Sequence, residues 1–390
     1  MKIKIFIIIT AGILIFPIIS KADVIHTGRV CSVEKKQGLA SCNAHVVTDT
    51  KGVPLVSQSP KGYGPQDIKN AYSISGRSNG RIVAIVDAYD DPTLKNDLDF
   101  YSQQYNLPIL PACKASASAS SVPCFQKINQ RGTLALPSIN KGWSMEIALD
   151  VETVHGLCPD CSILLVEATS PNMKNLTAAA DAAVKAGATV ISNSYGGPEF
   201  AGETSFDSHF NHPGIAFVFS SGDSGYGVQY PAASPYVTAV GGTSLYMSSG
   251  KYQNEDAWSG AGSGCSQFEN KPSWQTDAKC SGRTVADVSA VADPATGVAI
   301  YSSTNPKNQK GWFTVGGTSL AAPIIASVYA LSGNIHGQAN SLPYNLGSRS
   351  NLHDVVGGSN GSCFPTYLCT GKTKYDGPTG LGSPNGLGAF

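Results

Sequence analysis

Short runs of apolar residues constrain the fold of this chain more than any other feature. The first is Ile-Val-Ala-Ile-Val at residues 82–86. Similar runs occupy residues 162–166, 189–192 and 215–219. Because the runs lack alternating polar positions, each predicts a strand buried on both faces, as in a parallel sheet. Helical patterns at 143–155 and 175–186 lie between them. This alternation predicts an α/β fold, doubly wound, with a mostly parallel sheet flanked by helices.

The balance of charge argues against nucleic acid as a partner. The chain has 27 lysines and arginines and 27 aspartates and glutamates, and only 14% of its 390 residues are charged. Such a chain has no excess of positive charge with which to bind phosphates. With 42% hydrophobic residues it can bury a large core, so disorder is not expected.

The N-terminus predicts export from the cell. Lys2 and Lys4 precede an apolar run at 5–19, and small residues follow near position 22. This pattern is typical of a signal peptide covering residues 1–22. The alternative is an N-terminal membrane anchor, because the run approaches a spanning length. We expect cleavage and a secreted or periplasmic protein that is not held in a membrane.

The ten cysteines favour the same compartment, because they form five pairs of near neighbours. The pairs are Cys31/Cys42, Cys113/Cys124, Cys158/Cys161, Cys265/Cys280 and Cys363/Cys369. An even, locally grouped set behind a signal peptide predicts short-loop disulfides. The Cys158-Pro-Asp-Cys161 motif could instead be redox-active or half of a zinc site. The chain has no second motif of this kind, which favours a disulfide.

A candidate nucleophile lies in the stretch Gly-Gly-Thr-Ser-Leu-Ala-Ala-Pro at residues 316–323. The apolar run at 324–331 predicts a buried helix, with Pro323 near its start. Ser319 would then lie among free N–H groups at the helix N-terminus, where negative charge is favoured. The alternative is a serine that caps an ordinary core helix.

Two acidic residues occur in an otherwise apolar helix at residues 143–152. Glu146 and Asp150 are four positions apart and so share one face of the helix. Burying a carboxylate is costly, so the pair must be neutralised or used. Two close carboxyl groups tend to share a proton, which supplies a general base or acid. The alternative, a solvent-exposed acidic strip, does not suit so apolar a helix.

Polar residues follow several of the predicted strands, at the sheet edge where sites gather in α/β proteins. Asp87, Asn193 and Asp223 each lie just past a strand end. Asp223, in Ser-Ser-Gly-Asp-Ser-Gly, could be a plain turn former. It could also be a protonated acid that donates a hydrogen bond to an oxyanion.

Taken together, these motifs resemble those of the sedolisin family, the serine-carboxyl peptidases related to the subtilisins. The matching pieces are Glu146-x-x-x-Asp150, Ser-Gly-Asp-Ser-Gly at 221–225 and Gly-Thr-Ser-Leu-Ala-Ala-Pro at 317–323. Supporting stretches lie at 192–196, 287–290 and 379–382. The resemblance covers about residues 60–390 and implies a subtilisin-like peptidase domain at 61–390. Residues 23–60 are then a short extension and possible propeptide, although the family usually carries a long prodomain.

The resemblance also implies a role for each catalytic residue. Ser319 would attack the peptide carbonyl and Glu146 would take its proton. Asp150 would orient Glu146, and Asp223 would hold the oxyanion. The residues Ser192, Asn193, Ser194, Tyr195 and Gly196 would pair with the backbone of the substrate. The expected protein is a monomeric endopeptidase that acts on proteins or peptides, is favoured by acid pH and needs no organic cofactor.

The family further implies a calcium site near the C-terminus. Asp354, Val355 and Asp376 match its ligand positions. Lys372 and Lys374 replace the glycines expected before the second aspartate, and they would oppose a cation unless they point outward. Calcium takes oxygen from carboxylates and carbonyls alike, so we expect Ca²⁺ to bind.

Two other functions suit the sequence. A subtilisin-type Ser/His/Asp peptidase would use Asp87, but its histidine would have to be His155, which projects away from Glu146 and Asp150. An inactive secreted binding protein of the same fold would lack a catalytic group, whereas this chain lacks none.

Overall fold

The computed structural model describes residues 24–345 and 347–390. The predicted signal peptide therefore lies outside the described residues. No helix within the described part of the chain has the length and apolar character needed to cross a membrane.

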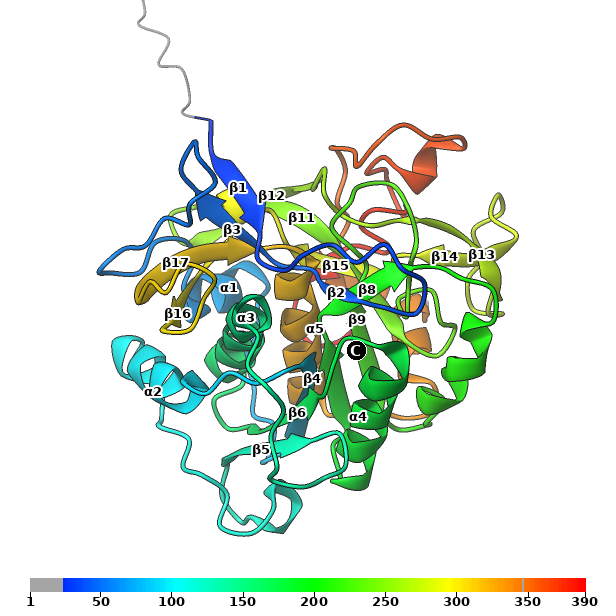
Figure 1. The fold of residues 1–390 in the computed structure, drawn as a ribbon. Coiled ribbons are helices and arrows are strands. Elements are labelled where there is room, and N and C mark those ends of the chain that lie inside the picture. The colour runs from blue at the N-terminus through cyan, green and yellow to red at the C-terminus, as the bar shows by residue number, and fades with distance from the viewer. Residues whose placement is uncertain (1–23, 346) are drawn as a thin grey trace, which may run out of the picture.

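A mostly parallel central sheet forms the core, in the order β12-β11-β9-β7-β4-β6-β5, with β15 beside β11 (Figure 1). Its strands are β4 (Ile82–Ala88), β5 (Phe125–Asn129), β6 (Ser162–Ala168), β7 (Val190–Asn193), β9 (Ala216–Ser220), β11 (Thr238–Ser248), β12 (Lys251–Ala257) and β15 (Val288–Val291). Only β12 runs antiparallel to its neighbour. The four predicted apolar runs are β4, β6, β7 and β9, and every residue in them is buried. The predicted fold class is confirmed.

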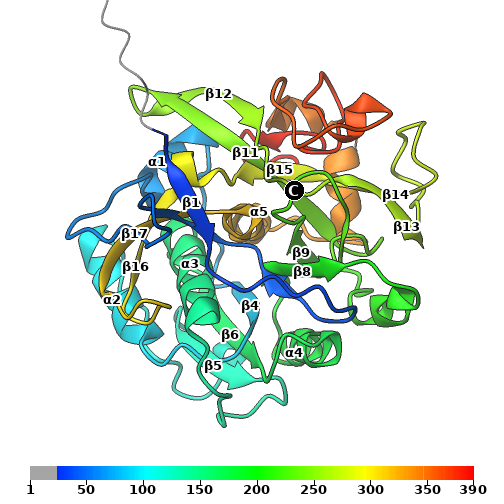
Figure 2. The same cartoon turned by 45° about the horizontal axis from the view of Figure 1, so that its top comes forward.

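The helices form layers on the two faces of this sheet. They are α1 (Pro65–Ala71), α2 (Leu94–Gln104), α3 (Lys141–Leu157), α4 (Met173–Lys185) and α5 (Thr318–Ser332). Helices α3 and α5 pack side by side, while α4 lies against β4 and β6 on the other face (Figure 2). Helix α3 begins where the Asn140 side chain accepts hydrogen bonds from the next N–H groups. Apart from its first residue, α3 is buried throughout, which places Glu146 and Asp150 inside the protein.

Helix α5 begins one residue before Ser319, with Gly317 as its N-cap at φ +99°. Only glycine adopts such a φ without strain. Pro323 was predicted near the start of the helix, among the residues whose N–H has no partner, but it is the sixth residue and lies beyond them. Proline has no N–H to donate to the carbonyl of Ser319 four residues earlier. The Ser194 hydroxyl lies 3.3 Å from that carbonyl oxygen and 2.9 Å from Asp150 Oδ1, so its one hydrogen is shared between them and partly compensates for the proline.

The N-terminal segment adds strands to two smaller sheets. Its strands are β1 (His26–Arg29), β2 (Ser41–Cys42) and β3 (His45–Thr48). Together with β8 (Tyr195–Pro198), β10 (Gln229–Tyr230), β16 (Val298–Ser302) and β17 (Gly311–Gly316) they form two sheets, in the orders β1-β3-β17-β16 and β10-β8-β2. The remaining strands are β13 (Gly264–Asn270), β14 (Gly282–Val285), β18 (Leu352–His353) and β19 (Ser383–Pro384). In both ribbon views β2 lies beside β8, so the segment that begins the described chain crosses the molecule.

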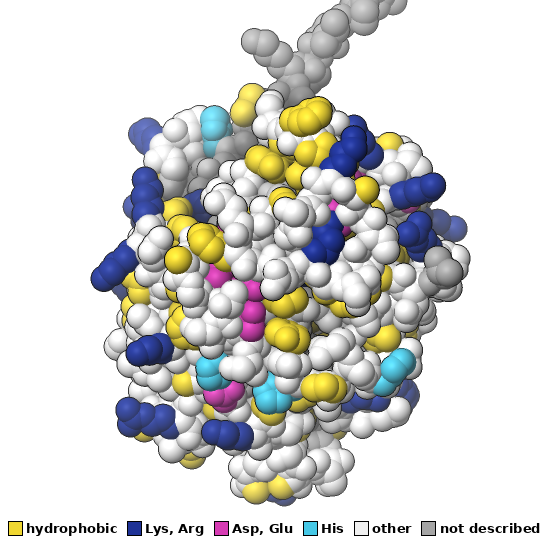
Figure 3. Space-filling model, turned by 90° about the vertical axis from the view of Figure 1, so that its right-hand side faces the viewer, with side chains coloured by type: hydrophobic (Ala, Val, Ile, Leu, Met, Phe, Trp, Pro, Cys, Tyr) yellow, Lys and Arg dark blue, Asp and Glu magenta, His cyan; other side chains and the backbone are white. Residues whose placement is uncertain are grey.

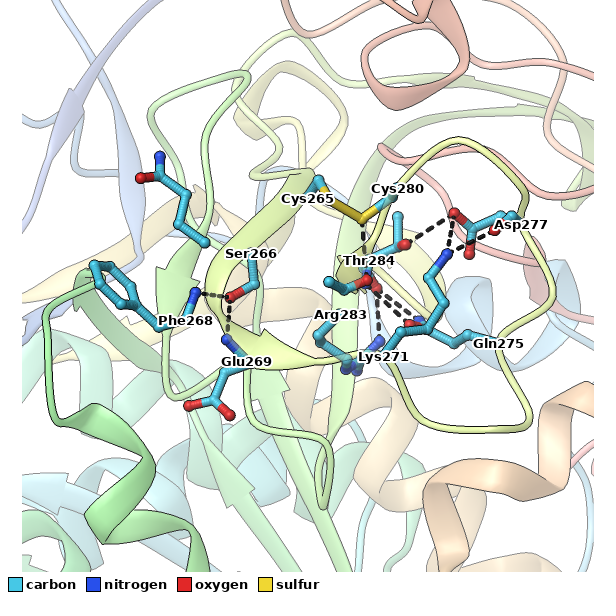
Figure 4. Close-up of a disulfide and its surroundings, with 12 residues drawn as sticks. Cys265, Ser266, Phe268, Glu269, Lys271, Gln275, Asp277, Cys280, Arg283 and Thr284 are labelled. Atoms are coloured by element: carbon cyan, nitrogen blue, oxygen red, sulfur yellow. Dashed lines mark hydrogen bonds and ion pairs between the residues drawn. A yellow bond between two sulfur atoms is a disulfide. The ribbon is translucent and has the colours of Figure 1, made fainter.

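Five disulfides join the cysteines in the predicted local pairs. One of them, Cys265–Cys280, closes the loop between β13 and β14 (Figure 4). Beneath it the buried Arg283 guanidinium donates to both carboxylate oxygens of Asp287. A buried ion pair of this kind needs such bidentate contact to offset the loss of hydration.

On the face shown in Figure 3, lysine and arginine side chains lie in the upper right of the view and along its left edge. Over the whole sequence, basic and acidic residues are equal in number.

Leu164 tests the packing of the central sheet, because it is fully buried in β6. We expect Leu164→Ala to lower the free energy of unfolding by about 2–5 kcal/mol through lost burial and the cavity left behind. Leu134→Ala is the matched control, since Leu134 is 75% exposed and its loss should change stability by less than about 0.5 kcal/mol. Denaturant unfolding measures both, and equal effects would contradict the assignment of β6 to the core.

Candidate active site

Ser319 lies at the N-terminus of α5, in the crevice between α3 and β8. Its backbone N–H donates to the carbonyl oxygen of Asn43 at 3.0 Å. Its hydroxyl donates to the carbonyl oxygen of Ser194 at 3.1 Å. The side chain is fully buried in this arrangement. The N-terminal segment therefore contacts the residue that the sequence singled out as the nucleophile.

Glu146 and Asp150 face this serine from α3 and are both fully buried. The Ser194 hydroxyl donates to Asp150 Oδ1 at 2.9 Å, and so links the acid pair to the strand beside Ser319. Glu146 has no fixed hydrogen-bond partner, but the Ser319 hydroxyl lies near enough to lower its pKa slightly. Burial outweighs that effect: it raises the pKa of Glu146 well above the usual value, and the charge of Asp150 raises it further.

A third buried carboxyl, Asp87, joins the pair from the end of β4. Both of its oxygens are buried without a partner. Burial raises the pKa of Asp87 well above its usual value, and the charges of Asp150 and Glu167 add to the effect. Burial likewise raises the pKa of Asp150, which the hydrogen bond from Ser194 partly offsets. The group of Glu146, Asp150 and Asp87 cannot be fully ionised, so it retains protons in the folded state.

Asp223 approaches Ser319 from the opposite side, on the loop after β9. Its Oδ1 accepts hydrogen bonds from the N–H and the hydroxyl of Thr318, at 2.8 and 2.7 Å. Its Oδ2 has no partner and lies beside Gly317, where an added Cβ would overlap both Oδ2 and the Asn43 carbonyl oxygen. Burial raises the pKa of Asp223 to about 7, although the bonds from Thr318 oppose the shift. Below that pH, Oδ2 can carry a proton and donate it toward a neighbouring oxygen.

Sequence reasoning missed two residues that surround Asp223. Thr318 fixes the carboxyl through both of its donors. His45 places Nε2 3.6 Å from Asp223 Oδ2 and packs edge-on against the Trp258 ring. Burial, and then the charge of Arg29, lowers the pKa of His45 to about 4, so this histidine is neutral at mildly acid pH. Thr318 belongs to the motif at 317–323, which could have indicated its role, whereas no local pattern in the sequence indicates that His45 lies at the site.

The predicted substrate-pairing residues divide between two strands. Ser192 and Asn193 end β7, where the Asn193 amide donates to the carbonyls of Ile191 and Val218 and stabilises the sheet. Tyr195 and Gly196 begin β8, which pairs antiparallel with β10 on one edge and with β2 on the other. The edge expected to receive a substrate thus carries residues of the chain itself.

The two aspartates predicted to bind calcium lie near each other, close to the C-terminus. Both oxygens of Asp354 accept from the N–H of Lys374, and Asp376 accepts from the N–H of Lys372 at 2.8 Å. Burial raises the pKa of Asp376 to about 7, and the nearby charge of Asp354 adds to the shift. Two neighbouring carboxyl groups supply oxygen atoms of the kind that a divalent cation such as Ca²⁺ takes as ligands.

The two lysines do not occupy this environment with their charges. Lys372 Nζ donates to Thr366 Oγ1, and the Lys374 side chain is exposed. Among the described residues no group of three or more His, Cys, Asp or Glu side chains could hold a metal ion. The remaining ligands would therefore be backbone carbonyls such as that of Val355, which calcium accepts. The residues present fit Ca²⁺ on this basis.

His155 lies apart from the crevice. It is fully buried, its Nε2 contacts the carbonyl oxygen of Pro108 at 2.9 Å, and burial lowers its pKa to about 4. Its charged neighbours are Lys69, Asp99 and Lys95, none of which belongs to the acid cluster. This position gives no support to a Ser/His/Asp triad that includes Asp87.

Comparisons with known proteins agree with this geometry. Residues 132–341, more than half of the chain, match the profile described as the Subtilase family. Kumamolisin from Bacillus sp. (strain MN-32) is 29% identical over 378 residues, which cover 85% of this chain and 63% of kumamolisin. Sedolisin from Pseudomonas sp. (strain 101) is 36% identical over 205 residues, which cover 44% of this chain and 33% of that protein. The chain thus spans less than two thirds of the curated relatives it matches.

A solved structure of Pseudomonas sedolisin, a serine-carboxyl proteinase complexed with two molecules of pseudo-iodotyrostatin, aligns with a TM-score of 0.70. The alignment is 29% identical and covers 84% of this chain and 96% of that one. The chain belongs to the subtilase family. Within that family it is a homologue of the sedolisin and kumamolisin type, the serine-carboxyl peptidases.

The buried carboxyl groups predict how stability depends on pH. Asp223 has a pKa of about 7 when folded and 3.8 as its ordinary value, so the folded state binds more protons between these limits. The free energy of unfolding should therefore fall as pH rises from about 4 to 7. We expect Asp223→Asn to make this fall shallower. Denaturant titrations at several pH values measure it, and a stability that rises over this range would contradict protonation of the cluster.

Proposed function

We propose that the protein is a serine-type endopeptidase that uses Ser319, Glu146, Asp150 and Asp223. The observation that carries the proposal is the convergence of three buried carboxyl groups on one serine at a helix N-terminus. In each step the chain's own groups move the protons. Glu146 takes the proton of the Ser319 hydroxyl as the oxygen attacks the carbonyl carbon of a peptide. It then returns the proton to the departing amine.

Asp150 acts through Glu146 as a positioning residue. When Asp150 is protonated, it is neutral and Glu146 is free to be the ionised member of the pair. The hydrogen bond between Asp150 and Ser194 holds it in place at 2.9 Å. Asp87 adds a further carboxyl that can retain a proton near the pair. Glu146 can then carry the single negative charge of this group.

Asp223 and the N–H of Ser319 form the oxyanion hole in this proposal. An oxyanion held between them would accept one hydrogen bond from the backbone and one from the protonated Oδ2. The bonds from Thr318 leave Oδ2 as the free oxygen. This requirement for a protonated Asp223 favours activity in acid.

Removal of the nucleophile tests the function directly. We expect Ser319→Ala to lower kcat for protein hydrolysis by at least about 10³-fold, as for other enzymes that lose a nucleophile. Hydrolysis of a denatured protein at acid pH measures it. Ser327→Ala, a buried serine further along α5, is the control and should retain activity. Equal activity in the two variants would contradict the assignment of Ser319.

The pH profile tests the role of Asp223. Its pKa of about 7 predicts that kcat/KM declines as the pH rises through that value, because the donor proton is lost. Asp223→Asn should keep part of the activity and extend it to higher pH, since the amide still donates. Asp223→Ala should lose about 10²–10³-fold in kcat. A profile that is flat from acid to alkaline pH would contradict the proposal.

Export and calcium binding complete the proposal. Five disulfides suit an oxidising compartment, so we propose a secreted or periplasmic enzyme. Asp354, Asp376 and the carbonyl of Val355 would hold Ca²⁺. The ion would neutralise the two carboxylates and fix the C-terminal loop.

Calcium should therefore raise the thermal stability. We expect a chelator to lower the Tm of the protein and added Ca²⁺ to restore it, because binding to the folded state alone stabilises it. Asp376→Asn should abolish this response. Thermal unfolding with and without chelator measures the effect, and a Tm that is independent of calcium in the unsubstituted protein would contradict the site.

A further inference from the structure

The N-terminal segment passes through the crevice between two strands of backbone. On one side the N–H of Ala40 donates to the carbonyl of Pro171 at 2.9 Å, and Leu39 pairs antiparallel with Asn172. On the other side β2 pairs antiparallel with the edge of β8. An extended peptide that adds to a sheet edge binds in this manner. Residues 39–43 therefore have the backbone contacts of a bound peptide (Figure 2).

The carbonyl of Asn43 lies where a reacting carbonyl would be held. Its oxygen accepts from the N–H of Ser319 at 3.0 Å. This oxygen and Asp223 Oδ2 both lie against Gly317. The N–H of Asn43 donates to the carbonyl of Ser194 at 3.2 Å. The contacts match those of an oxyanion hole, whose donors lie about 2.7–3.1 Å from the oxygen. The Asn43–Ala44 peptide bond is thus placed at the proposed nucleophile.

The side chain of Asn43 fills a polar pocket and is fully buried. Its Nδ2 donates to Ser220 Oγ at 2.9 Å and to Gln229 Oε1 at 3.3 Å. The carboxamide of Gln229 lies so close to Gly196 and Gly222 that a Cβ on either glycine would overlap it. Because these two glycines have no side chain, the Gln229 carboxamide has room to contact the side chain of Asn43. Because Oδ1 of Asn43 has no partner, recognition depends on the amide N–H groups.

Both sides of the Asn43–Ala44 bond are clamped. Before the bond, the disulfide Cys31–Cys42 fixes the neighbouring residue. After it, β3 pairs antiparallel with β1, and the N–H of Val30 donates to the carbonyl of Ala44 at 3.1 Å. A segment held on both sides stays in the crevice even if its bond is cut. Other peptides must therefore compete with this segment for the crevice.

We propose that residues 39–44 bind as the chain's own substrate, and that the pocket of Ser220 and Gln229 selects an asparagine before the cleaved bond. The inference rests on the proposed function of Ser319. A carboxamide donates to both groups, whereas an aspartate carboxylate cannot donate to Gln229 Oε1 and a leucine pairs with neither group, which is costly in a buried site. On cleavage, Ser319 Oγ bonds to the Asn43 carbonyl carbon and the bond to the Ala44 nitrogen breaks. The hydroxyl proton passes through Glu146 to that nitrogen, and water then hydrolyses the ester.

Peptides that carry a fluorophore and a quencher test the pocket. They are assayed with the double substitution Cys31→Ser and Cys42→Ser, which removes the disulfide that holds residues 39–44 and gives the loosened protein. The probe is Leu-Ala-Ser-Ala-Asn-Ala-His, compared with versions that carry Asp or Leu in place of Asn. We expect kcat/KM to be at least about tenfold higher for the Asn peptide, in keeping with two acceptors left unpaired by the others. Gln229→Ala should lower the ratio of kcat/KM for the Asn peptide to that for the Leu peptide by most of this factor. Equal kcat/KM values for the three peptides would overturn the pocket.

The same assay tests whether the segment closes the crevice. The protein with its disulfide intact should cleave the Asn peptide at least about tenfold more slowly than the loosened protein. Equal rates would overturn the proposed occupancy. If the loosened protein does not fold, the peptide assay is replaced by a measurement of self-cleavage in the chain with its disulfide intact, at acid pH. We then expect a new N-terminus at Ala44 that is absent in Ser319→Ala and at least about tenfold slower to form in Asn43→Leu.

The outcome separates this inference from the proposed function. If a mixed peptide library shows no cleavage that depends on Ser319, the proposed function itself fails. If cleavage depends on Ser319 but does not favour Asn, or the chain is cut equally fast in Asn43→Leu, only the carboxamide pocket fails.

Discussion

Burial of acidic side chains beside a serine hydroxyl is the constraint on which the site depends. Glu146 and Asp150 are fully buried on α3, and α3 packs directly against α5, which carries Ser319. The cost of ionising all of these groups in a low-dielectric interior keeps some of them protonated. Packing of the surrounding strands and helices on the central sheet offsets the free-energy cost of burying these carboxyl groups. Chemistry that needs a proton donor and a proton acceptor at the same place thus becomes available.

The site is built from elements that are far apart in the sequence. Helix α3 supplies the acid pair, the loop after β9 supplies Asp223, and the start of α5 supplies Ser319. Gly317 allows these elements to approach, since an added Cβ would overlap the carboxyl of Asp223. The N-terminal segment also reaches this place, because the carbonyl oxygen of Asn43 accepts from the N–H of Ser319 and lies, like Asp223 Oδ2, against Gly317. The residues proposed to act on a peptide bond therefore also contact the N-terminal segment that covers them.

Most of the core could be predicted from the sequence, because buried parallel strands leave continuous apolar runs such as residues 82–86. The acid pair was also predictable, since a carboxyl in an apolar helix conflicts with its surroundings. The neighbours of Asp223 were not. His45 and Asn43 reach the site through the pairing of β2 and β3 with distant strands, and short, partly polar strands carry little periodic signal. The position of Pro323 was wrong for a related reason: the compensating donor, Ser194, is remote in sequence.

The most direct test of the acid pair is the rate at which Ser319 is acylated by a small active-site-directed reagent in a single turnover at acid pH. Glu146→Gln should slow this acylation by at least about 10³-fold, because the proton acceptor is gone. Glu152→Gln is the matched control: Glu152 is equally buried on α3, but its carboxylate accepts from the N–H of Tyr301 at 2.9 Å. It should acylate within a few fold of the unsubstituted protein. Acylation of Glu146→Gln at the unsubstituted rate would contradict the account.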